Sequence, residues 1–199
     1  MGYSTILDIL GSIIMGGLLL LILWRLDASA TDNNFNYGAE VALQQNITTV
    51  ALILEHDFRK IGYCKDYNKI PDPSKSIISA DSTSIKFLTD VNDDGNVDTI
   101  YYYLGPISEL ASTPNPRDRL LHRIINGQTH QEANLGVTKF RLNYFGALGD
   151  TLSFPINNPG SISIIEINLQ VENSYAYNNQ YSQAFWRQLR LAARNLQNR

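Results

Sequence analysis

One short stretch, TDVNDDGNVDTI (89–100), concentrates side chains that could bind a metal ion. Calcium prefers carboxylate and amide oxygens, and a glycine permits the sharp turn that wraps them around the ion. The residues at positions 1, 3, 5, 6, 7 and 9 of the EF-hand loop pattern are Asp90, Asn92, Asp94, Gly95, Asn96 and Asp98. Asn96 would contribute its carbonyl, whereas position 12, a bidentate Glu in that pattern, is Tyr101. The stretch predicts a calcium site of weak affinity that stiffens the loop and takes no part in catalysis.

The same residues also fit a hairpin turn that needs no ion. Asp and Asn side chains accept hydrogen bonds from nearby backbone N–H groups, and Gly95 would take a positive φ. Asp93 is then expected to point to solvent. Because apolar stretches flank the loop, both interpretations place it between two strands, and the sequence leaves both open.

The rest of the sequence offers no constellation for catalysis. His56 and Asp57 are neighbours on a predicted helix, where consecutive side chains diverge by about 100°, so a mutual catalytic bond is not expected. His122 and His130 lie in a loop-rich stretch without a metal-binding cluster, and surface positions are expected for both. The chain also lacks a nucleophile elbow and a glycine-rich phosphate loop. We therefore expect a protein that is not an enzyme.

Composition limits the remaining classes of function. The 199 residues carry 16 basic and 19 acidic side chains, mixed along the chain, for a net charge of −3. Without a basic stripe, binding to nucleic acid is not expected. The one cysteine, Cys64, excludes an intramolecular disulfide and a cysteine-based zinc site, and is expected to be a small buried residue. The length suits one ordinary core with an appendage.

The N-terminal segment is apolar enough for a bilayer. Residues 9–24, ILGSIIMGGLLLLILW, carry no charge, and with their apolar neighbours they approach the roughly 20 residues of a membrane span. A carboxylate deep in lipid costs about 3 kcal/mol, so Asp8 is expected at the membrane edge or beside a partner. Arg25 argues weakly against placing the carboxyl side outside. The start, MGYST, lacks a basic residue, which favours an anchor over a cleaved signal, although Ala28–Ala30 would suit cleavage.

A second helical pattern follows the apolar segment. Apolar residues recur every three or four positions between residues 43 and 61, which predicts one helix face laid on a globular domain. This stripe consists of Leu43, Ile47, Val50, Leu54, Phe58 and Ile61. Asp57 and Arg59 are assigned to the solvated face. Between the two helical parts, residues 33–38 contain three Asn and Gly38, which weaken helix propensity, so a kink, a melted turn or a short break is expected there.

Beyond Gly62 the sequence changes to short apolar runs separated by turn residues. Strands are expected at 76–80, 84–89, 99–105, 137–145 and 162–172. The segment 184–196 has good helix formers, but a strand is favoured beside a strand-rich region. Tyr101, Tyr102 and Tyr103 must alternate between faces, so at least one is exposed, on a half-polar surface or in a partner-binding patch. We expect an α+β fold with a membrane or filament-core helix at 1–30, its amphipathic second half at 31–61 and a β-rich head at 62–199.

A long N-terminal helix packed on an antiparallel sheet resembles the architecture of type IV pilins and type II secretion pseudopilins. Residues 54–63, LEHDFRKIGY, resemble the end of the long helix in the larger minor pilins and pseudopilins of the W and J types, where D-[LF]-R-x-[AI]-G-Y is common. Residues 85–104 resemble their strand, acidic loop and Tyr-rich strand. GVTKFRLNYF (136–145) and LAARNL (191–196) are also similar, so the resemblance covers most of the chain.

The resemblance implies a structural subunit of a pilus-like or pseudopilus-like filament, without catalysis. In this family cleavage follows a glycine, an aromatic residue comes first, and a Glu at the fifth mature position pairs with the next subunit's amino terminus. Gly2 and Tyr3 match the cleavage point, but Leu7 would be fifth and Asp8, sixth, would substitute for the Glu. The implied partners are other pilin-like subunits, through the N-terminal helix, and the membrane before assembly. The implied location is the bacterial inner membrane with the head outside the cytoplasm, or an extracellular filament.

An alternative keeps the anchor and the head without polymerisation. In that interpretation the chain is a single-span envelope protein whose β-rich head binds a partner or ligand. The state of the N-terminus and the presence of the protein in filaments sheared from cells distinguish the two.

Overall fold

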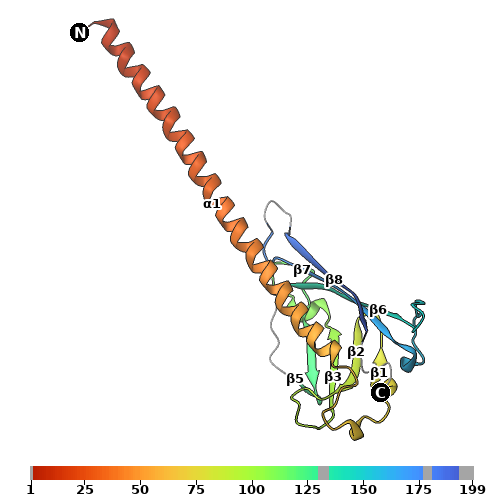
Figure 1. Cartoon of the computed structure of the whole chain (residues 1–199). Coiled ribbons are helices and arrows are strands. Elements are labelled where there is room, and N and C mark those ends of the chain that lie inside the picture. Colours follow the sequence, from red (N-terminus) through yellow and green to blue (C-terminus); the bar gives the residue numbers. More distant parts are fainter. Residues whose placement is uncertain (1, 130–134, 177–180, 193–199) are drawn as a thin grey trace. The chain divides into compact units, whose positions relative to one another are not determined.

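A computed structural model describes residues 2–129, 135–176 and 181–192 (Figure 1). One long helix precedes two antiparallel sheets, of five and three strands, which confirms the predicted α+β class. The chain divides into two compact units, Met1–Val41 and Ala42–Arg199.

The helix α1 (Tyr3–Arg59) supplies the first unit and continues into the second. Proline, the strongest helix breaker, does not occur before Pro71, and leucine and isoleucine dominate the first turns. The apolar side chains of this part are exposed, for example Leu7 at 68% and Trp24 at 69%. Soluble proteins do not expose apolar surface of this extent to water. The helix is long and apolar enough to span a membrane, which indicates an anchor.

The expected break at residues 33–38 is wrong, because α1 continues through Asn33, Asn34, Asn36 and Gly38. Each of these residues costs at most about 1 kcal/mol relative to alanine. A break would also forfeit backbone hydrogen bonds and require a second, unfavourable helix nucleation. Weak propensity without a proline is therefore insufficient to interrupt a helix that is formed on both sides.

The part of α1 in the second unit buries the predicted apolar stripe. Its buried members are Leu43, Ile47, Val50, Leu54 and Phe58. The helix ends because Gly62 has a φ of +74°, and its N–H donates to the carbonyl of Leu88 at 2.9 Å. A Cβ at this position would lie 3.0 Å from Ser76 Oγ, so the turn accommodates glycine best.

The five-stranded sheet is a meander in which each strand pairs antiparallel with the next. Its strands are β1 (Ile77–Ala80), β2 (Ser84–Thr89), β3 (Asp98–Leu104), β4 (Leu121–Ile125) and the short β5 (Gln128–Thr129). Single 3₁₀ turns lie in the connections at Tyr67–Lys69, Pro73–Lys75, Ile107–Leu110 and, before β7, Pro159–Ser161. The register places Lys86 opposite Tyr101 and Tyr103 opposite His122.

The three-stranded sheet consists of β6 (Val137–Phe145), β7 (Ile164–Glu172) and β8 (Gln183–Ala192), with β7 in the centre. The strand predicted for the last segment is confirmed over Gln183–Ala192, and residues 193–196 lie outside the described residues. Polar and apolar residues alternate along most of β6 and β7, which turns one face of each strand toward the core, although Glu166 and Glu172 of β7 are also buried.

One hydrophobic core joins α1 to both sheets. Phe58 of α1 lies with its ring centroid 5.6 Å from Phe87 and 5.7 Å from Tyr102. From the other sheet, Phe140, Leu142, Tyr144, Ile165 and Ile167 enter the same core. Cys64 is 2% exposed, which confirms the predicted buried cysteine.

Candidate functional site

The loop between β2 and β3 is organised around one buried carboxylate, Asp90. Its Oδ2 accepts the backbone N–H groups of Lys65 at 3.1 Å and Gly95 at 2.9 Å, and its Oδ1 accepts that of Asp94 at 3.1 Å. Burial favours the neutral acid, but these N–H donors outweigh it and hold the pKa of Asp90 below its ordinary value. Gly95 takes a φ of +81°, as the turn interpretation predicts.

The remaining oxygens of the predicted calcium ligands also accept hydrogen bonds from the protein. Asp94 Oδ1 accepts the N–H of Asn96 at 2.7 Å, and Asn92 Oδ1 accepts that of Asp94 at 3.3 Å. Asp98 Oδ2 accepts the N–H of Val91 at 3.0 Å, and Lys69 Nζ donates to Asn96 Oδ1 at 2.8 Å. This network is the Asx-rich turn of the second interpretation.

Two lysines bring positive charge to the loop. Besides Lys69, Lys60 Nζ lies 3.1 Å from Asp93 Oδ1 and within 3.4 Å of the carbonyl oxygens of Asp90 and Val91. Asp93 is thus half exposed and paired, where a purely solvated side chain is expected. Within residues 2–129, 135–176 and 181–192, no group of three or more His, Cys, Asp or Glu side chains is placed to hold a metal ion. An ion at this loop would have to displace protein donors, and calcium binding stays a prediction.

Asp57 is buried, and its assignment to a solvated helix face is wrong. Its Oδ2 accepts the Tyr102 hydroxyl at 2.6 Å and the Arg123 Nε–H at 2.6 Å, while 3% of its side chain is exposed. Burial, followed by the nearby Asp57 carboxylate, raises the pKa of Tyr102 well above its ordinary value. The three residues connect α1 to β3 and β4. Arg59, in contrast, is exposed and pairs with Glu55 one turn away.

The structure also places two of the histidines: His56 contacts its neighbour Asp57, and the surface position expected for His122 is wrong. His56 Nδ1 lies 3.2 Å from Asp57 Oδ1, because the inward carboxylate still presents one oxygen toward the neighbouring ring. His122 is buried on β4, where its Nε2 lies 2.8 Å from Glu109 Oε2 and its ring stacks on Tyr103 at 4.3 Å. The strand β4 was not predicted from the sequence, because the residues on both sides of it are typical of loops. His130 lies outside the described residues.

The three consecutive tyrosines alternate faces as predicted. Tyr102 is buried, whereas Tyr101 and Tyr103 are half-buried on the opposite face with ring centroids 5.0 Å apart. Stacking of Tyr103 on His122 continues this row across the sheet. The row is a half-polar sheet surface in which the aromatic rings cover one another.

The residues predicted for processing and assembly, Gly2, Tyr3 and Asp8, are exposed at the start of the first unit. Tyr3 is 90% exposed. The backbone carbonyl of Asp8 accepts the Ser12 hydroxyl at 2.7 Å. Among the described residues, the Asp8 carboxylate has no ion-pair partner, so its charge is available to another chain or to the membrane interface.

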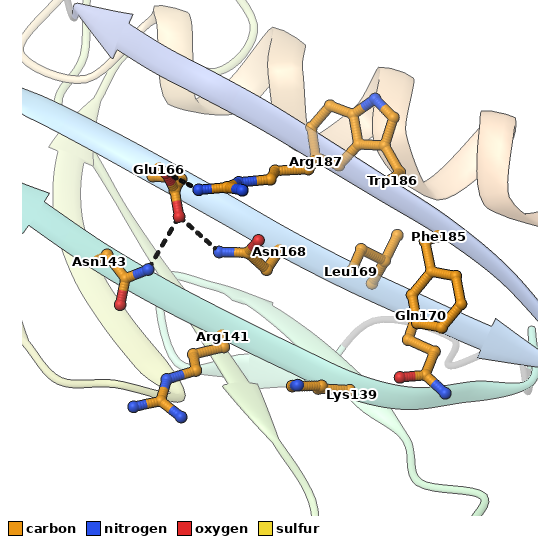
Figure 2. A pocket seen from close by; sticks show the side chains of 10 residues that line it. All are labelled: Lys139, Arg141, Asn143, Glu166, Asn168, Leu169, Gln170, Phe185, Trp186 and Arg187. Carbon is orange, nitrogen blue, oxygen red and sulfur yellow. Dashed lines mark hydrogen bonds and ion pairs between the residues drawn. The ribbon is translucent and has the colours of Figure 1, made fainter.

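The sequence did not single out the solvent face of the three-stranded sheet as a site, yet it carries a shallow groove (Figure 2). Glu166 lies at one end, 5% exposed, and accepts hydrogen bonds from Asn143 and Asn168 at 2.9 Å. Arg187 Nη2 lies 2.9 Å from the other oxygen of Glu166. Burial alone would raise the pKa of Glu166, but these donors lower it below its ordinary value. The sequence pattern that could have predicted the groove is the alternation in β6 and β7, which places polar residues on this face.

No protein family, curated protein or solved structure matched the chain in the comparisons. Three surfaces of the molecule could bind a partner or a ligand. They are the apolar exposed part of α1, the Asx-rich loop, and the groove on the three-stranded sheet.

Proposed function

We propose that this chain is a structural, non-catalytic subunit of a type IV pilus-like or type II secretion pseudopilus-like filament. The observation that carries the proposal is the distribution of exposed and buried apolar residues along α1. One uninterrupted helix has a first part whose apolar side chains are exposed and a second part that belongs to the core of a β-rich head. Such a helix can reside in a membrane and later pack among similar helices.

The first part of α1 supplies the cohesion of the proposed filament. Burying a leucine or isoleucine side chain away from water is worth about 2 kcal/mol, so a subunit that leaves the bilayer must cover this surface with other subunits. Within lipid the gain is smaller, because acyl chains are as apolar as leucine, and helix association then depends on close packing and polar contacts. Asp8 is the polar group available for such a contact.

Asp8 supplies the register between subunits. Its exposed carboxylate lies in an apolar environment once the helix is in a membrane or filament, which is unfavourable without a cation. The amino terminus of a neighbouring subunit would neutralise it in one relative position of the two helices. A buried ion pair of this kind specifies alignment more than it adds stability.

The location and the partners follow from the same design. Before assembly the chain resides in the bacterial inner membrane, with the head outside the cytoplasm, and after assembly it is part of an extracellular or periplasmic filament. The partners are other pilin-like subunits, which contact the N-terminal helix.

The test is the state of the native N-terminus in two fractions. Intact mass and N-terminal sequencing should show a chain that begins at Tyr3 in filaments sheared from the cell surface. A chain that keeps Gly2 and is confined to membranes would contradict the filament proposal. It would favour the single-span envelope protein, which has the same helix and head.

A further inference from the structure

The solvent face of β6, β7 and β8 carries polar side chains in register (Figure 2). One row across the sheet consists of Lys139, Gln170 and Phe185. The next row consists of Arg141, Asn168 and Arg187. Rows on the same face of a sheet lie about 7 Å apart along the strands. The groove therefore presents two cations along β6, amides along β7, and an aromatic ring followed by a cation along β8.

Among the described residues, two of the three cations have no counter-charge. Lys139 and Arg141 are exposed, and no carboxylate in the part of the chain that the structure describes pairs with either of them. Arg187, by contrast, is neutralised by Glu166. The groove thus has a net positive charge on a chain whose overall charge is −3. The exposed Arg141 guanidinium offers a planar fork of N–H donors, which matches a carboxylate in bidentate geometry.

Glu166 fixes the positions of three side chains of the groove in the absence of a ligand. It accepts hydrogen bonds from Asn143, Asn168 and Arg187 at once, and Figure 2 shows these three side chains converging on it. Side chains held in this way lose less conformational entropy when a ligand binds. Because Arg187 compensates the charge of Glu166, the buried carboxylate does not repel an anion on the surface above it.

Phe185 is the most exposed apolar side chain of the groove, which Leu169 and Trp186 also line. Its side chain is 66% exposed on β8, although it lies beside Gln170 in the neighbouring strand. An exposed aromatic ring offers a flat surface on which the apolar face of another ring can pack. The neighbouring amide groups offer hydrogen-bond donors and acceptors for hydroxyl groups around that ring. A sugar ring has both features, with C–H groups on its face and hydroxyl groups on its rim.

We propose that this groove binds an acidic polysaccharide whose sugar rings carry carboxylates, a polyuronate. The carboxylates pair with Lys139 and Arg141, the amides of Asn168 and Gln170 bond hydroxyl groups, and one ring packs on Phe185. A single-stranded nucleic acid fits less well, because its bases require a series of stacking rings and its phosphates a longer basic track. The proposal concerns the head and holds whether or not the chain polymerises.

The experiment is calorimetric titration of the full chain in a neutral detergent with short oligouronates, in calcium-free buffer. Neutral gluco-oligosaccharides and oligothymidylate of equal length serve as comparison ligands. The decisive variant is Lys139→Ala/Arg141→Ala. Its matched control is Lys65→Ala/Lys75→Ala, which removes two exposed lysines from the loops that precede β1 and therefore changes the net charge equally. Phe185→Ala and Phe185→Tyr test the ring, and thermal unfolding of each variant verifies the fold.

Saturable oligouronate binding is expected, weakened about tenfold or more for each cation removed from β6 and by less than twofold in the control. Phe185→Ala should weaken it several-fold, and Phe185→Tyr should preserve it. If oligouronate binding is weakened equally in both double variants, the effect comes from the net charge of the protein and the proposal is overturned. Absence of saturable binding would overturn it as well. Tighter binding of oligothymidylate would assign the groove to nucleic acid instead.

Discussion

Asp57 is the residue on which the attachment of α1 to the five-stranded sheet depends most. One oxygen of the Asp57 carboxylate, Oδ2, accepts hydrogen bonds from both Tyr102 and Arg123, and the carboxylate is almost completely buried. Asp57→Ala leaves a partly buried guanidinium without its counter-charge, which should lower the free energy of unfolding by about 3 kcal/mol. Tyr102→Phe removes the hydroxyl that donates to Asp57 and accepts from Arg123 Nε at 3.0 Å, and the loss of both hydrogen bonds should cost about 2 kcal/mol. Denaturant unfolding of the full chain in detergent measures both values.

A compensating variant provides the control for this prediction. Asp57→Ala/Arg123→Met removes both charges, so it should be more stable than Asp57→Ala alone. If the single and the double variant unfold at the same denaturant concentration, the two side chains are not coupled.

Asp90 should make the stability of the head dependent on acid. Its folded pKa lies below the unfolded value of about 3.9, because N–H donors stabilise the carboxylate. The contribution is therefore complete above the unfolded pKa and is lost as the pH falls through the folded pKa. Unfolding measured from pH 7 to pH 2 should show stability decreasing below about pH 4. Asp90→Asn should lower stability at pH 7 and flatten this acid branch, whereas an unchanged branch would assign the acid sensitivity to other carboxylates such as Glu166.

Residue partners were the least predictable feature of this sequence. Cys64 was predicted correctly because one local property, its apolar character, decides its burial. Asp57 was not, because its partners Tyr102 and Arg123 lie on strands far along the chain. Glu166 likewise acquires its donors from neighbouring strands. Polarity alone cannot distinguish a solvated carboxylate from one buried against distant donors.

At the scale of elements, periodicity was sufficient where it was strong. The apolar stripe from Leu43 to Phe58 and the alternation in β6 and β7 each specify one buried face, and the structure confirms both. Residues 33–38 have weak propensity and no apolar pattern, and the expected break there was wrong. Continuity of a helix depends on the hydrogen bonds of its flanks as much as on local propensity.

The loop between β2 and β3 sets the expected strength of calcium binding. Protein donors already satisfy its oxygens, and the bidentate Glu of the pattern is absent, so a dissociation constant of about 1 mM is expected. Calcium at about 10 mM would then stabilise the fold by about 1.4 kcal/mol and raise the melting temperature by about 4 °C. Thermal unfolding in calcium, compared with magnesium at the same concentration and with chelator, measures this shift.

Asp94→Ala tests whether any such shift comes from the loop. The variant removes a carboxylate that bonds Asn96 and occupies a predicted ligand position, so the calcium effect should disappear. If magnesium shifts the melting temperature equally, or if calcium does not shift it at this concentration, the loop is an Asx-rich turn without a specific calcium site.

For the whole molecule, the two units have different requirements. The head, from Ala42 onward, has a core built from α1 and both sheets. The first unit has exposed apolar side chains and one acidic residue, Asp8, within its apolar run. Its stability depends on what surrounds it, lipid or other helices, and a mutation there should affect assembly rather than folding of the head.

Asp8→Ala is the substitution that separates these two effects. If Asp8 pairs with the amino terminus of a neighbouring subunit, its loss should reduce the protein in sheared filaments by about tenfold or more, which corresponds to about 1.4 kcal/mol per contact. The amount in the membrane and the melting temperature of the head should stay unchanged, because Asp8 belongs to the first unit and the head has a core of its own. Asp8→Glu should retain assembly, and Asp27→Ala, which removes an exposed carboxylate later in α1, serves as the matched control. Normal filament incorporation of Asp8→Ala would refute the role in register and leave the apolar surface of α1 to align subunits alone.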